Sequence, residues 1–406
     1  MENSEAKTTE KRGSVAEVFL AALRLGLMSF GGPIAHLGYF HEEYVIKRKW
    51  IDEQSYGDIV SFAQSLPGAA SSKTGIMVGT HRAGVFGGIA AWIGFTLPTA
   101  VALTIFGFIV ESLNVANAGW LEGLKIAAVV IVAQAVWNMG KNLAPDRLRG
   151  TIAIGAAIAA LAFENFAEGQ VVIIAASGLI GWFLLRNIPT KEVRVSLAER
   201  IPRWLSISSL VAFFGLIIGL PIAREFISNH ALDLFDSFYR TGALVFGGGH
   251  VVLPLLNTEV VQPGWVSSSN FLAGYGMTQA MPGPLFAFSA FLGVVMNQSP
   301  NGVEGAFLCL FAIFLPSFLL VYGPLPYWDT LRQKQNFQSV LRGINAGVVG
   351  ILLAALYNPI FTSSIFNTAD FALLLGLGGM LFILKRPPWN VVLVAAVVGE
   401  IISLVH

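Results

Sequence analysis

Three positively charged residues lie inside apolar stretches of this sequence, where a charge is costly. Arg24 and Arg240 occupy equivalent places in two similar segments, and Lys73 follows a Pro-Gly pair. A charge in an apolar segment usually faces a partner, a cavity or a substrate path. The arginine side chain presents a planar fork of donors that matches a tetrahedral oxyanion. These residues favour an anion site, whereas Glu43 and Glu259 are either ion-pair partners of the arginines or proton-coupling and gating carboxylates.

Two glycine-rich segments interrupt the apolar stretches that contain the arginines. Glycine permits unusual backbone torsions and the close approach of a ligand, and a helix that begins at such a break directs free N–H groups at an anion. Tight helix packing through small residues is the alternative. For His250 a packing or interfacial role is favoured over proton relay. The candidate substrate-binding residues of these segments are Gly31, Gly32, Pro33, Gly247, Gly248, Gly249 and His250.

Two Pro-Gly segments follow, one in each half of the chain. Proline and glycine in the middle of an apolar segment interrupt the helical hydrogen bonds, and the ends of the resulting half-helices can face each other. The glutamine amides and the serine hydroxyls offer donors to an oxyanion, and a kink with internally satisfied polar groups is the alternative. The candidate residues are Gln64, Pro67, Gly68, Ser71, Ser72, Lys73, Gln279, Pro282, Gly283 and Pro284.

These paired segments belong to an internal duplication of the chain. Identities recur in one order along both halves, which chance does not explain. The matched residues are Arg24 and Arg240, Gly26 and Gly242, Phe30-Gly31-Gly32 and Phe246-Gly247-Gly248, Glu43 and Glu259, Trp50 and Trp265, Gln64 and Gln279, Pro67-Gly68 and Pro282-Gly283, Gly87 and Gly305, Leu97-Pro98 and Leu315-Pro316, Gly123 and Gly343, and Asn138 and Asn358.

The composition indicates that lipid surrounds most of the folded surface. Of 406 residues, 55% are hydrophobic and 12% are charged, and the mean hydropathy is +0.68; soluble proteins have about 25% charged residues. A net charge of +1 gives no electrostatic case for nucleic acid. The single Cys309 excludes an internal disulfide and a cysteine-based metal site, and neither a histidine ligand spacing nor a nucleotide-binding motif is present. No metal, cofactor or enzymatic activity is expected.

The elements that position these residues are predicted to be membrane helices. Apolar runs of suitable length give about thirteen segments, at 15–32, 58–80, 84–110, 121–140, 150–165, 170–186, 206–223, 237–256, 270–297, 302–322, 339–357, 369–385 and 389–405. We expect a cytoplasmic N-terminal tail over 1–14, without the features of a signal peptide. A first repeat over 15–186, a linker and connecting span over 187–223 and a second repeat over 224–406 follow.

The basic residues predict how the two repeats are oriented. The basic linker should be cytoplasmic, and an extra span after it would make the second repeat enter the membrane from the opposite side, as inverted repeats do. A simple count of thirteen spans would place the basic cluster Lys47-Arg48-Lys49 outside the cell, against the rule that basic residues lie on the cytoplasmic side. If 15–32, 58–80 and their repeats are broken or re-entrant helices, this cluster returns to the cytoplasm. The predicted fold is an all-α integral membrane protein with two inverted repeats of this kind.

The motifs resemble those of the chromate ion transporter family, in its two-domain form. The resemblance rests on Phe30-Gly31-Gly32-Pro33 with Glu43 and Trp50, on Leu66-Pro67-Gly68, and on two longer segments of the second half. Those two run from Phe246 to Pro254 and from Phe271 to Phe286. In the family the first Pro-Gly motif usually continues Pro-Glu, but this chain has Ala69-Ala70 followed by Ser71-Ser72-Lys73. Because this motif differs from that of the family, the coupling ion and the preference for chromate can differ as well.

The resemblance implies a multi-pass protein of the plasma (inner) membrane that exports chromate, driven by the proton motive force or the membrane potential. Sulfate or another oxyanion is an alternative substrate, and a passive anion channel is an alternative mechanism. The expected partners are the oxyanion and the lipid bilayer, with a homodimer as a possible assembly. The substrate site is expected between the two broken-helix pairs, with Arg24, Lys73 and Arg240 offsetting the substrate charge.

Overall fold

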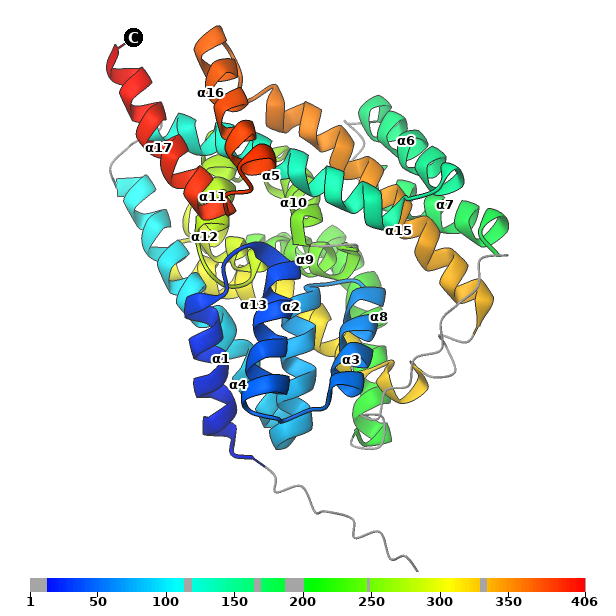
Figure 1. Ribbon diagram of the computed structural model, residues 1–406. Coiled ribbons are helices and arrows are strands. Elements are labelled where there is room, and N and C mark those ends of the chain that lie inside the picture. The colour runs from blue at the N-terminus through cyan, green and yellow to red at the C-terminus, as the bar shows by residue number, and fades with distance from the viewer. Residues whose placement is uncertain are drawn as a thin grey trace, which may run out of the picture.

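The computed structural model describes residues 13–112, 119–163, 169–186, 201–246, 249–328 and 334–405. Within these ranges the chain forms helices and no β-strand, which confirms the all-α prediction (Figure 1). Gly247 and Gly248, most of the predicted linker and nearly all of the N-terminal tail lie outside the described residues.

The first four helices form two hairpins whose turns are the predicted breaks. Helix α1 (Val15–Met28) leads to the glycine break, and α2 (Gly32–Phe40), continued by the π-helical η1 (His41–Lys47), runs back toward the end where α1 starts (Figure 1). Helix α3 (Glu53–Ser65) then leads to the Pro-Gly break, after which α4 (Ala70–Ser112) begins. Trp50 Nε1 donates to Glu17 Oε1 at 3.2 Å, so the α2–α3 connection returns to the end where α1 starts.

Helix α4 is itself folded back at Ala83 and Gly84, where the backbone leaves the helical conformation. The parts before and after this kink pack closely, since a Cβ atom on Gly79 would lie 2.5 Å from the carbonyl oxygen of Gly87. The Gly13 N–H group donates to the Arg82 carbonyl at 3.1 Å. The kink therefore lies at the same end as the start of α1, and both hairpins enter and leave the bundle at that end.

The second half repeats this arrangement. Helix α9 (His230–Leu244) leads to the second glycine break; η4 (Gly249–Val251), α10 (Val252–Leu256) and the π-helical η5 (Asn257–Val261) follow. Helix α11 (Ser268–Ala280) leads to the second Pro-Gly break, followed by η6 (Leu285–Ala287), α12 (Phe288–Val294) and α13 (Gly302–Tyr322). The imidazole of His230 contacts the Trp265 ring edge-on, and the Asn297 N–H group donates to the Trp265 carbonyl at 3.0 Å. The start of α9 and both connections thus share one end.

Several of the remaining helices pack on helices of the other half. Helix α5 (Gly119–Leu143) packs on α17 (Pro388–Val405), and α15 (Gln335–Ala355) packs on α7 (Gly169–Leu184) and α6 (Arg147–Ala162). Backbones touch at matched glycines, because a Cβ atom on Gly123 would overlap the Ala395 carbonyl and one on Gly343 would overlap that of Ser177. The π-helical η8 (Leu356–Phe361) continues α15, and α16 (Thr368–Gly378) with η9 (Gly379–Ile383) precedes α17.

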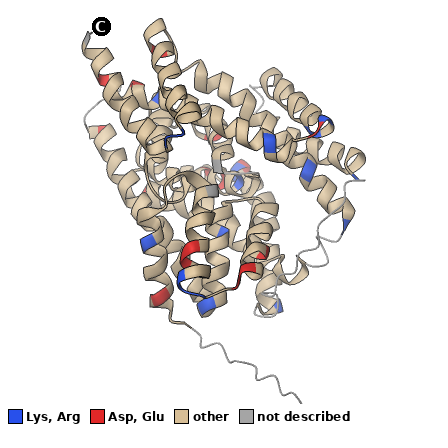
Figure 2. Cartoon of the chain, viewed as in Figure 1, with Lys and Arg blue, Asp and Glu red and all other residues tan. Residues whose placement is uncertain are grey.

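Helix α8 (Arg203–Phe226) lies between the halves in sequence and packs on α9 and α13. By length and composition, five described helices can cross a membrane: Ala70–Ser112, Gly119–Leu143, Arg203–Phe226, Gly302–Tyr327 and Gln335–Phe361. The predicted segments 58–80, 237–256 and 270–297 are each divided at a break rather than continuous. Charged residues are sparse along the helices and gather mainly near their ends (Figure 2).

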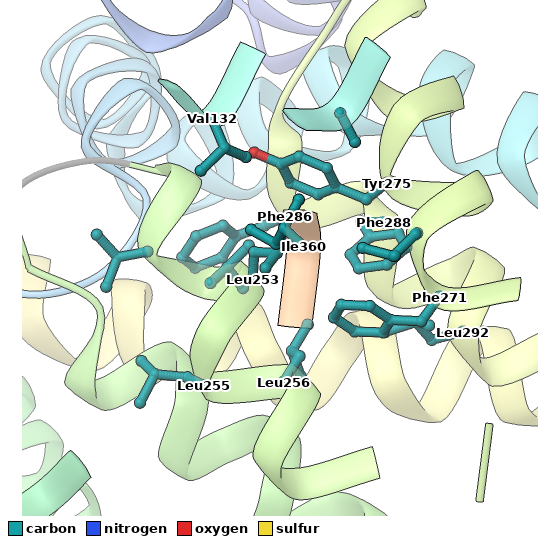
Figure 3. Packing of buried hydrophobic residues seen from close by; sticks show 14 of the residues in the cluster. Val132, Leu253, Leu255, Leu256, Phe271, Tyr275, Phe286, Phe288, Leu292 and Ile360 are labelled. Carbon is teal, nitrogen blue, oxygen red and sulfur yellow. The ribbon is translucent and has the colours of Figure 1, made fainter. Parts of the chain in front are cut away.

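An apolar core lies beside the breaks of the second half. Aromatic and aliphatic side chains from α10, α11, η6 and α12 converge there with Val132 and Ile360 (Figure 3). Leu253, Phe271, Phe288 and Leu292 have no exposed surface. In a bilayer, close van der Waals packing rather than transfer from water holds helices together, so these contacts stabilise the short helices after the breaks.

Candidate functional site

The breaks of the two halves are joined by reciprocal hydrogen bonds. The Gly68 N–H group donates to the Val245 carbonyl at 2.7 Å, and the Gly283 N–H group donates to the Ser29 carbonyl at 2.9 Å. Gly68 and Gly283 have φ values of +102° and +96°, which favour glycine. Each Pro-Gly break therefore binds the residue just before the glycine break of the opposite half, and the chain brings all four breaks to one place, here called the junction.

The two glycine breaks also approach each other at the junction. A Cβ atom on Gly32 would lie 4.0 Å from His250 Nε2, and His250 Nδ1 is hydrogen-bonded to the Tyr275 hydroxyl at 2.8 Å. Gly31, with φ +97°, caps α2, and Pro33 lies in its first turn. Gly249 begins η4. The structure thus brings together the described glycine-break residues of the two halves.

Four helical segments begin at the junction, and four helices end there. Helices α2 and α4 and the segments that start with η4 and η6 direct their N-terminal N–H groups toward the breaks. Those N-terminal ends carry a partial positive charge, which favours an anion. The opposing C-terminal carbonyls of α1, α3, α9 and α11 would cancel it, but several of them already have donors. Thr99 Oγ1 donates to the Pro282 carbonyl, and the two glycine N–H groups bind the ends of α1 and α9.

Lys73 is buried beside the first Pro-Gly break. Its Nζ donates to the Leu66 carbonyl at 2.5 Å and to the Pro67 carbonyl at 2.8 Å, and the side chain has no exposed surface. Within the described part of the chain no ion pair joins Lys73 to a carboxylate. The two carbonyl dipoles stabilise an ammonium group at this buried position, and a bound anion would stabilise it further.

Buried donors without partners lie at or beside the breaks. Among the described residues, the hydroxyls of Ser29, Ser72 and Ser317 and the Nε2 amide of Gln279 are buried and make no hydrogen bond. Ser317 Oγ is 2.8 Å from the position of a Cβ atom on Gly68. Buried polar groups normally have partners, so these four groups suit a ligand with several acceptor oxygens. Ser71 Oγ lies 3.4 Å from His36 Nδ1 instead, and Gln64 is exposed on α3.

The predicted arginines have different surroundings. Arg24 is exposed on α1, on the face that also exposes Leu20, Leu27 and Met28. Arg240 Nη2 binds Asp236 at 2.9 Å and Glu259 at 3.0 Å. The structure therefore pairs Arg240 with Glu259, one of the two alternatives left open for that carboxylate.

The two matched glutamates share a local conformation but not a partner. Glu43 lies in the π-helical η1 and Glu259 in the π-helical η5, and such segments are frequent at functional sites. Glu43 accepts a hydrogen bond from Arg48 Nε at 2.7 Å and is buried. Their roles in coupling or gating stay predictions.

Sequence reasoning missed several residues at the junction and beyond it. Ser29 lies directly before the first glycine-rich motif. Thr99 and Ser317 each follow a Leu-Pro pair, so the repeat alignment matches them with each other. Tyr275 and His36 have no motif that marks them. Asp236 lies four residues before Arg240, a helical spacing for an ion pair that could have revealed it.

Apolar helices, an internal repeat and discontinuous helices that meet between the repeats define a multi-pass membrane protein with the build of many secondary transporters. The chain belongs to the chromate transporter family, whose model matches residues 16–182 and 232–400. The two matched stretches correspond to the two halves described above, and the linker and α8 lie between them.

Relatives cover most of this chain and of their own length. A chromate transport protein of Pseudomonas aeruginosa is 27% identical over 84% of this chain and 79% of its own. An uncharacterised transporter of Methanocaldococcus jannaschii is 30% identical over 85% of each chain. A chromate transport protein of Cupriavidus metallidurans is 24% identical over 84% of this chain and 82% of its own. No solved structure matches the chain.

Proposed function

We propose that this protein is a secondary active transporter that exports chromate across the plasma (inner) membrane. The observation that carries the proposal is the junction, where four helix breaks, the buried Lys73 and several buried donors without partners lie together. Chromate is chosen as the substrate because similar proteins are named chromate transport proteins. Chromate is a tetrahedral dianion, so its oxygens can accept bonds from hydroxyl and amide donors and from N–H groups in the first turns of the helices, while the ammonium group offsets its charge.

The arrangement of the hairpins supports inverted repeats and alternating access. Each half presents a pair of hairpins whose turns meet the turns of the other half, and the contacts are reciprocal. If the start of α1 is cytoplasmic, Lys47, Arg48 and Lys49 return to the cytoplasm with it, since Trp50 contacts Glu17. Every basic cluster then obeys the positive-inside rule, and the two halves can rock about the junction to expose it to either side.

Sulfate is the second candidate substrate, because the donors at the junction recognise a tetrahedral dianion rather than chromium. Ala70 stands where family members usually carry a glutamate, and Lys73 follows three residues later, so the preference between oxyanions can differ from that of the family. A passive anion channel is the alternative mechanism.

The test is flux in proteoliposomes that contain the purified protein. Radiolabelled chromate is followed while a pH gradient or a membrane potential is imposed, and the measurement is repeated with sulfate. We expect chromate to accumulate against its own gradient when one of the two forces is applied. Flux that only dissipates a chromate gradient would indicate a channel, and accumulation of sulfate without chromate would identify the other substrate.

A further inference from the structure

A chain of ion pairs connects α8, α9 and η5. Arg224 on α8 binds Asp233 at 2.9 Å and Asp236 at 2.7 Å. Arg240 on α9 shares the same Asp236 oxygen at 2.9 Å and binds Glu259 on η5 at 3.0 Å. Asp236 is central to this network and only 1% exposed. A single buried carboxylate therefore links the connecting helix to two elements of the second half.

The network faces a cavity of about 480 Å³, lined also by Glu225, Thr258, Gln262 and Trp265. Both arginines bind Oδ2 of Asp236, and Oδ1 is buried without a hydrogen-bond partner among the described residues. A buried acceptor without a partner is unfavourable, and more so when it carries a charge. A proton on Oδ1 neutralises the carboxylate and so lowers the cost of burying it.

The charge of the cavity selects the kind of ligand. Four carboxylates, from Glu225, Asp233, Asp236 and Glu259, face two guanidinium groups, from Arg224 and Arg240. When all six groups are ionised, the lining has an excess of two negative charges. Such a lining repels a dianion such as chromate and attracts a proton. The cavity is thus distinct in chemistry from the junction.

Few other titratable groups surround this network. His230, at the start of α9, contacts the Trp265 ring on the cavity wall. Helix α13, which packs on α9, carries Glu304, Cys309 and Tyr322, and none of these lines the cavity. Helix α10, the remaining neighbour of α9, has no titratable side chain.

The described residues that match this network in the first half are arranged differently. The repeat alignment places Leu20 on Asp236, so the central carboxylate is missing there. Glu17, which aligns with Asp233, binds Arg82 at 3.2 Å, and Glu43 binds Arg48 at 2.7 Å. Arg24 is exposed. Arg224 lies on α8, outside both stretches that match the family.

We propose that Asp236 is the binding site of the coupling proton, and that each chain has one such site. The proton adds to the free Oδ1 and converts the carboxylate to a neutral carboxyl group. Arg224 and Arg240 then lose their shared ion-pair partner and keep only Asp233 and Glu259, which weakens the contact of α8 with α9; release of the proton restores both ion pairs. This inference rests on the proposed oxyanion transport and names the group that couples it to a pH gradient.

The experiment compares the wild type with Asp236→Asn, which keeps the shape and one acceptor but cannot ionise. Proteoliposomes are tested for exchange of radiolabelled against unlabelled chromate at equal pH, and for accumulation driven by a pH gradient. We expect exchange to stay within about twofold of the wild type and pH-driven accumulation to fall by at least about tenfold, within the usual range of coupling between two sites. Glu304→Gln, which removes an exposed carboxylate from the same half, is the matched control and should change neither assay.

Asp236→Glu provides a second variant if Asp236→Asn does not fold, because it keeps an ionisable group; it should retain pH-driven accumulation with a shifted pH profile. Unchanged accumulation in Asp236→Asn, or an unchanged pH profile in Asp236→Glu, would overturn the proposal. A wild type that exchanges chromate but accumulates it only with a sodium gradient would overturn the proton site alone. A wild type without chromate exchange would overturn the proposed function and this inference with it.

Discussion

At the scale of single residues, the charges inside apolar segments have unlike surroundings. The sequence indicates that Arg24, Lys73 and Arg240 are unusual, because each interrupts an apolar run. It does not indicate which way each side chain faces, since that depends on the helix packed beside it. Lys73 is buried against two carbonyls, Arg240 is bound by two carboxylates, and Arg24 is exposed among Leu20 and Leu27.

The different surroundings of the two matched arginines predict that alanine has a small effect at Arg24 and a large effect at Arg240. Arg24→Ala should change chromate exchange little and should not lower stability, because Arg24 lies on an exposed apolar face where a charge is costly. Arg240→Ala leaves the buried Asp236 with one ion-pair partner fewer, and breaking a buried ion pair costs about 3–5 kcal/mol. Thermal unfolding in detergent together with exchange rates checks both. A large loss of exchange in a stable Arg24→Ala protein would return Arg24 to the substrate site.

At the scale of elements, the positions of the helix breaks could be predicted from sequence, but the path of the chain after each break could not. The Pro-Gly and glycine-rich motifs mark the four turns, and the predicted gap between 58–80 and 84–110 falls at the kink of Ala83 and Gly84. The π-helical segments that carry Glu43 and Glu259 have no sequence signal, because they arise from local packing rather than from proline or glycine. The return of each hairpin to its starting end likewise depends on contacts between distant residues, such as Trp50 with Glu17.

The break at Gly283 should be intolerant of a side chain. Gly283→Ala places a Cβ atom against Thr99 Oγ1 and within 3.3 Å of the Phe95 carbonyl, in a backbone conformation that costs other residues about 1–2 kcal/mol. We expect a lower melting temperature and slower chromate exchange. Gly57→Ala, in the interior of α3 with no atom near the new Cβ, should stabilise by about 0.5–1 kcal/mol. Equal melting temperatures for the two variants would contradict the close contact at the junction.

At the scale of the whole molecule, the duplication could be recognised from sequence but the exchange of helices could not. Gly123 matches Gly343, yet both glycines can pack on either of two similar last helices. In the structure each packs on the last helix of the opposite half, α17 for Gly123 and α7 for Gly343. The two halves are therefore interlocked, and neither completes the junction alone because each supplies hydrogen bonds to the other.

The proposed orientation predicts the accessibility of the hairpin ends. Cys309 is buried on α13, so a Cys309→Ser background allows single cysteines to be introduced. Lys47→Cys, at the exposed end of η1, should react with an impermeant thiol reagent only from the cytoplasmic side. Gln298→Cys, exposed in the connection before α13, should react only from the outside if the repeats are inverted. Reaction of Lys47→Cys from outside would exclude the re-entrant hairpin, and reaction of both from one side would exclude inversion.

The claim that the junction binds a tetrahedral oxyanion is tested most directly by equilibrium binding of radiolabelled chromate to purified protein. Lys73→Met removes the buried positive charge at nearly constant volume, and Arg24→Ala removes a positive charge from the exposed face of the same half. We expect Lys73→Met to weaken binding by at least about tenfold, the equivalent of one charge-assisted contact, while Arg24→Ala binds like the wild type. A folded Lys73→Met protein that binds chromate with unchanged affinity would contradict the assignment of the substrate site to the junction.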